Sequence, residues 1–124
     1  MSTSALSVRA FVGAKDYEQS RAFYRALDFE EVVIDARMSY FRIGENLGFY
    51  LQCAFVKDWV DNTMLLLEVA DPAAYREQLL AKELPKRFPG VRLSAVRRED
   101  WGQVCFLHDP SGVLWQIGAF GSVS

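Results

Sequence analysis

Residues 101–116 of the chain read WGQVCFLHDPSGVLWQ. Within this segment and just beyond it, Gln103–His108 and Gly112–Gly118 each have the pattern of a β-strand. Between them, the sequence Asp109–Pro110–Ser111–Gly112 has the composition of a tight turn, because Asp, Ser and Gly favour turn conformations and Pro presets φ. We therefore expect two strands joined by a tight turn.

A strand, a helix and another strand precede this pair. Residues Met64–Ala70 predict the first strand, and Asp71–Pro72 is a strong helix start, with an N-cap followed by proline at the first helical position. We expect the helix to end near Lys82–Leu84, because Pro85 follows. The next expected strand is Val91–Arg98.

The first half of the chain has the same order of elements. Asp16 is a candidate N-cap, and Gln19 is placed as its capping-box partner. Phe23 and Leu27 follow at the spacing of an amphipathic helix. The expected elements are the strand Ser7–Gly13, the helix Tyr17–Leu27, and the strands Glu30–Asp35, Met38–Ile43 and Gly48–Cys53.

Local details also recur in the two halves. One residue stands seven positions before each helix cap, Arg9 in the first half and Met64 in the second. Each predicted last strand contains the pattern Gly-x-x-x-Gln, at residues 48–52 and 112–116. Matches that occur in the same order indicate a duplicated βαβββ module.

The duplication predicts the domain organisation. The first module comprises residues 5–60 and the second residues 61–120, and both belong to one compact domain of the α+β class. The stretch Ala54–Thr63 is expected to be a polar connector between them.

The composition excludes several classes of protein. Of the 124 residues, 51% are hydrophobic and 24% are charged, which rules out disorder. A formal net charge of −2 argues against general electrostatic binding to nucleic acid or to an anionic membrane. There is no long apolar run, no signal-peptide pattern and no Cys-x-x-Cys pair, so we expect a cytoplasmic protein with reduced cysteines.

The chain resembles the vicinal oxygen chelate superfamily, which includes glyoxalase I, extradiol dioxygenases and bleomycin-resistance proteins. The resemblance covers about residues 6–120 and implies two βαβββ modules whose strands form a curled mixed sheet around a cleft. The residues that carry it are Asp16, Ser20, Ala22, Phe23, Tyr24, Leu27, Trp101, Gly102, Phe106, Asp109, Pro110, Ser111, Gly112, Leu114 and Trp115.

The resemblance also implies where a metal would bind. Metal-dependent members take one ligand from the first and one from the last strand of each module, and the internal repeat places Arg9, Gln52, Met64 and Gln116 at these positions. A guanidinium has no lone pair to donate, a thioether is soft, and amides are weaker donors than carboxylates. We therefore expect neither a metal nor another cofactor.

The predicted cleft has the character of a small-molecule site, with apolar walls and a few directed polar groups. Its candidate ligand-binding residues are the four positions that the resemblance implies, strand residues that alternation places on the same face, and two tryptophans in polar surroundings. These are Arg9, Phe11, Tyr50, Gln52, Trp59, Met64, Glu68, Trp101 and Gln116.

Among superfamily members, the chain is most similar to the metal-free bleomycin-resistance proteins, which sequester a drug as dimers. The resemblance therefore implies a metal-independent, non-catalytic binding protein that sequesters an aromatic or amphipathic ligand as a homodimer. An enzyme of the glyoxalase or dioxygenase type with a displaced metal site stays open, as does a structural role with a collapsed cleft. His108 is a turn residue, a proton carrier or a single metal ligand. Glu68 is either an ion-pair partner of Arg9 or another arginine, or a general base.

Overall fold

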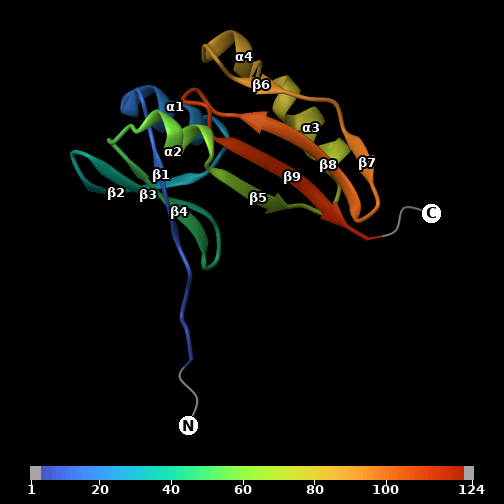
Figure 1. Cartoon of the computed structure of the whole chain (residues 1–124), viewed down its shortest axis with the longest axis horizontal. Helices are drawn as coiled ribbons and strands as arrows, with labels where there is room; N and C mark the ends of the chain where they lie inside the picture. The colour runs from blue at the N-terminus through green and yellow to red at the C-terminus, as the bar shows by residue number, and fades with distance from the viewer. Residues whose placement is uncertain (1–3, 122–124) are drawn as a thin grey trace.

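The computed structural model describes residues 4–121, and two β-sheets form its framework (Figure 1). In the first sheet the strand order is β1-β4-β3-β2, with β1 parallel to β4 and the other pairs antiparallel. The elements of this half are β1 (Ala10–Gly13), α1 (Tyr17–Ala26), β2 (Glu30–Asp35), β3 (Met38–Gly44) and β4 (Leu47–Gln52).

The second sheet repeats this topology. Its order is β5-β9-β8-β6, β5 runs parallel to β9, and β7 also pairs with β8. The elements are β5 (Met64–Glu68), α3 (Pro72–Ala81), α4 (Leu84–Arg87), β6 (Arg92–Leu93), β7 (Arg97–Glu99), β8 (Gly102–His108) and β9 (Leu114–Phe120). The predicted fold class, α+β with two βαβββ modules, is confirmed.

Both predicted helix caps are confirmed. The Asp16 carboxylate accepts a hydrogen bond from the backbone N–H of Gln19, and Asp71 accepts from Ala73 and Ala74. Each carboxylate satisfies donors that the first turn of a helix leaves unpaired.

Four predictions differ from the structure. The first strand begins at Ala10 rather than at Ser7, and the expected connector contains a short helix, α2 (Lys57–Asp61). Pro85 lies at the start of α4 rather than ending the helical region, because proline fits the first turn of a helix. The single strand expected at 91–98 is interrupted, since the Ser94 hydroxyl accepts the backbone N–H of Phe106 in place of a ladder carbonyl.

The two modules share one hydrophobic core, in which Tyr24 is central. The Tyr24 hydroxyl donates to Oδ2 of Asp109 at 2.6 Å and accepts from Nε1 of Trp115 at 3.0 Å. Oδ1 of Asp109 accepts three backbone N–H groups, from Ser111, Gly112 and Val113, so the Asp-Pro-Ser-Gly turn is anchored to α1.

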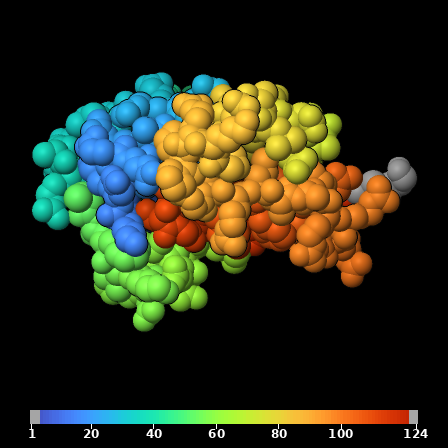
Figure 2. Space-filling model, turned by 90° about the horizontal axis from the view of Figure 1, so that it is seen from above, coloured from blue at the N-terminus to red at the C-terminus, as the bar shows by residue number. Residues whose placement is uncertain are grey.

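The helices also meet across the module boundary. Phe23 of α1 packs edge-on against Phe88, which follows α4, with 5.6 Å between ring centroids. Figure 2 shows α1 (blue) beside the α3–α4 segment (yellow to orange) on one face of the molecule. Among residues 4–121, no helix combines the length and the apolar character needed to cross a membrane.

Candidate functional site

The outward face of the first sheet carries an ordered group of aromatic rings around an arginine. Nη1 of Arg9 donates a hydrogen bond of 2.9 Å to the Tyr50 hydroxyl, and the guanidinium carbon lies 4.6 Å from the ring centroid of Tyr40. The Tyr50 ring stacks on Phe11, with centroids 4.7 Å apart and planes inclined by 17°. We call these four residues, Arg9, Phe11, Tyr40 and Tyr50, the aromatic platform.

The alternation of the strands explains why these side chains lie outside. Val12, Phe41 and Leu51 are completely buried, so their neighbours along each strand face the opposite side of the sheet. Phe11 and Tyr50 are also register partners in the parallel β1–β4 pair, which brings their rings together.

A recess adjoins the platform. Its volume is about 100 Å³, and its wall includes Trp59 of α2, whose side chain is 74% exposed. The residues that line this recess are Phe11, Gly13, Gln52, Ala54, Val56, Trp59, Val60 and Thr63. Because Phe11 belongs to both, the platform and the recess form one continuous surface that contains the predicted residues Arg9, Phe11, Tyr50, Gln52 and Trp59.

The other predicted residues lie with the second sheet. Nε2 of Gln116 donates to the Met64 sulfur at 2.8 Å. Trp101 packs against Phe120 with 5.3 Å between ring centroids, and its ring covers Gly118. The structure therefore divides the predicted site between two sheets instead of placing all nine residues in one cleft within the chain.

The pairing of the strands corrects the internal register. Tyr50 lies opposite Phe11 in the first sheet, and Gln116 lies opposite Leu66 in the second. Since Phe11 and Leu66 both stand five residues before their helix caps, Tyr50 and not Gln52 is the counterpart of Gln116. The glycine pattern misled the alignment because Gly48 lies within β4, whereas Gly112 lies in the turn before β9.

The corrected positions do not suit a metal ion. They hold a guanidinium, a phenol that accepts from this guanidinium, a thioether and an amide that donates to the thioether. These groups are poor ligands for divalent first-row metals, which prefer imidazole and carboxylate donors. Within residues 4–121, no group of three or more His, Cys, Asp or Glu side chains is placed to hold a metal.

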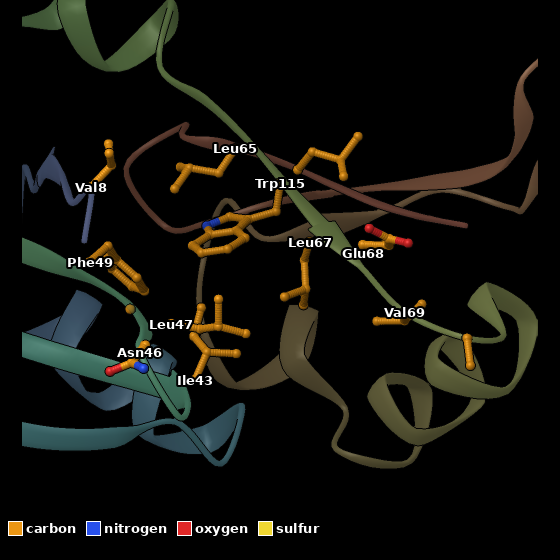
Figure 3. Close-up of a pocket in the computed structure, with 13 residues that line it drawn as sticks. Val8, Ile43, Asn46, Leu47, Phe49, Leu65, Leu67, Glu68, Val69 and Trp115 are labelled. Atoms are coloured by element: carbon orange, nitrogen blue, oxygen red, sulfur yellow. The ribbon is translucent and has the colours of Figure 1, made fainter. Parts of the chain in front are cut away.

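A larger hollow lies between the modules, where β5 passes the hairpin of β3 and β4 (Figure 3). Its volume is about 650 Å³, the Trp115 ring points into it, and Glu68 is the predicted site residue that lines it. Its lining consists of Val8, Ile43, Asn46, Leu47, Gly48, Phe49, Leu65, Leu66, Leu67, Glu68, Val69, Ala70 and Trp115. The hollow depends on the angle between the modules, for which the sequence carries no signal.

His108 lines a third hollow, of about 420 Å³, on the second sheet. Burial lowers the pKa of its imidazole, and the neighbouring charge of Arg92 lowers it further. Arg92 is also its register partner in the β6–β8 pair. The ring is therefore mostly neutral at pH 7.

Sequence reasoning left Tyr40 out of the site. The sequence did carry a signal for it. Tyr40 lies on the expected strand that precedes the strand of Tyr50, and residues opposite each other in an antiparallel pair share a face. In the structure, Tyr40 and Tyr50 are register partners, with ring centroids 5.1 Å apart.

Known structures resemble the chain over almost its whole length. The bleomycin-binding protein from bleomycin-producing Streptomyces verticillus, complexed with copper(II)-bleomycin, is 21% identical with a TM-score of 0.78 over 97% of this chain and 100% of that one. The antibiotic-binding protein TnmS3 from Streptomyces sp. CB03234 is 19% identical, with a TM-score of 0.75 over the same shares of the two chains. A glyoxalase/bleomycin resistance protein/dioxygenase domain from Frankia sp. EAN1pec is 16% identical, with a TM-score of 0.71 over 97% and 100%.

No protein-family model and no curated protein matches the sequence. The structural likeness defines the fold, which is that of the glyoxalase and bleomycin-resistance proteins. The resemblance seen in the sequence is thus confirmed at the level of the fold.

Proposed function

We propose that the chain is a metal-independent binding protein that sequesters an aromatic or amphipathic small molecule on the platform and recess. The observation that carries this proposal is the Arg9–Tyr50 pair. It occupies two positions where metal-dependent proteins of this fold would hold ligands, and it stands beside an exposed aromatic stack. Phe11 is 55% exposed, so a ligand ring that covers it removes apolar surface from water.

Two further observations support the proposal. None of the described residues that line the recess is charged, and the platform adds the polar groups of Arg9 and Tyr50. Apolar surface with a few directed polar groups is typical of small-molecule sites. In addition, several solved proteins with this fold are described as binding bleomycin or an antibiotic.

We propose the outward face of the second sheet as an additional contact surface, through Met64 and Gln116. Met64 is 59% exposed and its sulfur already accepts a hydrogen bond from Gln116, so the thioether is held in place. A polarizable thioether packs well against aromatic ligands.

The test is a thermal-unfolding and calorimetric screen of aromatic antibiotics, including bleomycin, with and without EDTA. A ligand at about one hundred times its Kd is expected to stabilise the fold by about 2.7 kcal/mol, and chelation is expected to change nothing. A screen in which no compound raises the Tm, or in which EDTA abolishes binding, would contradict the proposal.

A matched pair of variants locates the site. Phe11→Ala is expected to weaken binding about ten-fold or more, because it removes the ring on which the ligand stacks. Phe120→Ala is the control, since Phe120 is 57% exposed and is the last residue of β9, in the second sheet, whereas Phe11 lies in the first. Equal effects of the two substitutions would argue against the platform.

A further inference from the structure

We infer that the ligand carries an anionic oxygen group, a carboxylate or a phenolate, next to its aromatic ring, and that Arg9 binds this group. The inference rests on the proposed function and adds the charge of the ligand to it. It comes from the surroundings of Arg9, the one charged residue among the described residues of the platform and the recess.

Arg9 forms no ion pair with any residue from 4 to 121. Its partners among the described residues are the Tyr50 hydroxyl and the rings of Tyr40 and Tyr50, all of them uncharged. By contrast, Arg21 contacts both Glu18 and Glu31. The Arg9 guanidinium therefore brings an uncompensated positive charge to the platform.

The same contacts fix the orientation of the guanidinium. Contact with the face of the Tyr40 ring restrains the guanidinium on one side, and the bond from Nη1 to Tyr50 restrains its rotation. A guanidinium has five N–H donors, and the bond to Tyr50 uses one of them. The remaining donors can bind a carboxylate through two parallel hydrogen bonds, and their fixed position lowers the entropy cost of binding.

The position of the charge also suits an aromatic acid. The Arg9 bond ends on the hydroxyl of Tyr50, and the ring of the same residue stacks on Phe11, which begins the recess. A ligand whose ring covers Phe11 would thus place a group attached to this ring near the guanidinium. An ammonium in this place would meet a fixed positive charge instead.

The experiment compares three probes with the same ring and different charges: naphthalene-2-carboxylate, naphthalen-2-ylmethanol and naphthalen-2-ylmethylammonium. Titrations followed by NMR report affinity, and the indole N–H signal of Trp59 reports binding at the recess. We expect the carboxylate to bind about ten-fold more tightly than the alcohol and the ammonium most weakly, with a preference that declines as salt is added.

The matched variants are Arg9→Gln and Arg42→Gln. Arg42 is an exposed arginine two residues along β3 from Tyr40, with no hydrogen bond or ion pair to a platform residue. We expect Arg9→Gln to abolish the preference for the carboxylate over the alcohol, while Arg42→Gln retains this preference. Tyr50→Phe keeps the stack on Phe11. We expect it to reduce the preference for the carboxylate about three-fold, because the guanidinium loses its hydroxyl partner.

The outcomes separate this inference from the proposed function. Equal binding of carboxylate and alcohol, or a preference that survives Arg9→Gln, overturns the inference and leaves an aromatic binding site. Failure of the carboxylate to bind also overturns it, and the antibiotic screen then decides the proposed function by itself.

Discussion

Gly48 is a single residue on which the geometry of the platform depends. A Cβ atom at this position would collide with the hydroxyl end of Tyr40 and with the backbone carbonyl of Phe41. The Tyr40 ring can lie across β4 and beneath the Arg9 guanidinium only because residue 48 has no side chain.

The substitution Gly48→Ala is therefore expected to destabilise the fold by about 1–3 kcal/mol, since a backbone oxygen cannot move aside as a flexible side chain can. Gly44→Ala is the control, because its Cβ would meet only Leu47 Cδ1 at an ordinary 3.5 Å. Urea unfolding of both variants checks this. Equal stability of the two would mean that the contact with Tyr40 and Phe41 is not tight.

At the scale of elements, α1 is held to the first sheet by a charged network around Glu31. The Glu31 side chain is only 9% exposed and accepts hydrogen bonds from Arg21 at 2.6 Å, Arg25 at 2.8 Å and Ser39 at 2.6 Å. Burial by itself would raise the pKa of Glu31, but these hydrogen bonds outweigh it and lower the pKa from 4.5 to about 2.

The network predicts a loss of stability in acid. Because the pKa of Glu31 is lower in the folded state than in the unfolded state, its contribution is complete above the unfolded value and is lost as the pH falls from about 5 to about 2. The contribution at neutral pH is about 3 kcal/mol, and Glu31→Gln should remove this part of the pH dependence. Urea unfolding of the two proteins at pH 7 and pH 3 measures it; parallel losses in both would contradict the assignment.

Sequence reasoning worked best for elements with local signals. The caps at Asp16 and Asp71 and the turn at 109–112 follow from interactions within a few residues, and all three appear in the structure. The helix α2 was missed because it lacks a side-chain cap, and the interruption near Ser94 was missed because it depends on Phe106, which is distant in sequence.

The candidate site could be predicted only in part, because it too depends on contacts between residues that are distant in sequence. Strand alternation was enough to place Phe11 and Tyr50 on the same face as Arg9, and the three residues do meet. The choice of Gln52 as an equivalent of Gln116 needed the register between strands, which hydrogen bonds set and a short glycine pattern does not encode.

At the scale of the whole molecule, the segment before β1 carries exposed apolar side chains. Leu6 and Val8 are 92% and 94% exposed, and the chain before Val8 leads away from both sheets (Figure 1), whereas Val8 borders the hollow between the modules and Arg9 contacts the first sheet. In addition, β5 is an edge strand whose exposed Leu66 lies by the hollow between the modules. Exposed apolar side chains and an unpaired strand edge favour association with a second copy.

We therefore expect a homodimer, and Val8→Asp is expected to weaken it. The control is Ser7→Asp, which adds the same charge at the neighbouring polar position. Sedimentation equilibrium should show a dimer for the unsubstituted chain and for Ser7→Asp, with a dissociation constant at least about ten-fold higher for Val8→Asp. A monomer at every concentration would contradict the expectation.

The bond between Tyr24 and Asp109 has a consequence for how the chain becomes a folded protein. Each partner is buried, and each comes from a different module, so neither half can complete its own interior. If the backbone were cut within α2, the two fragments should remain largely unstructured in isolation and should acquire native structure together when mixed. The covalent link between the halves would then serve mainly to raise their effective concentration.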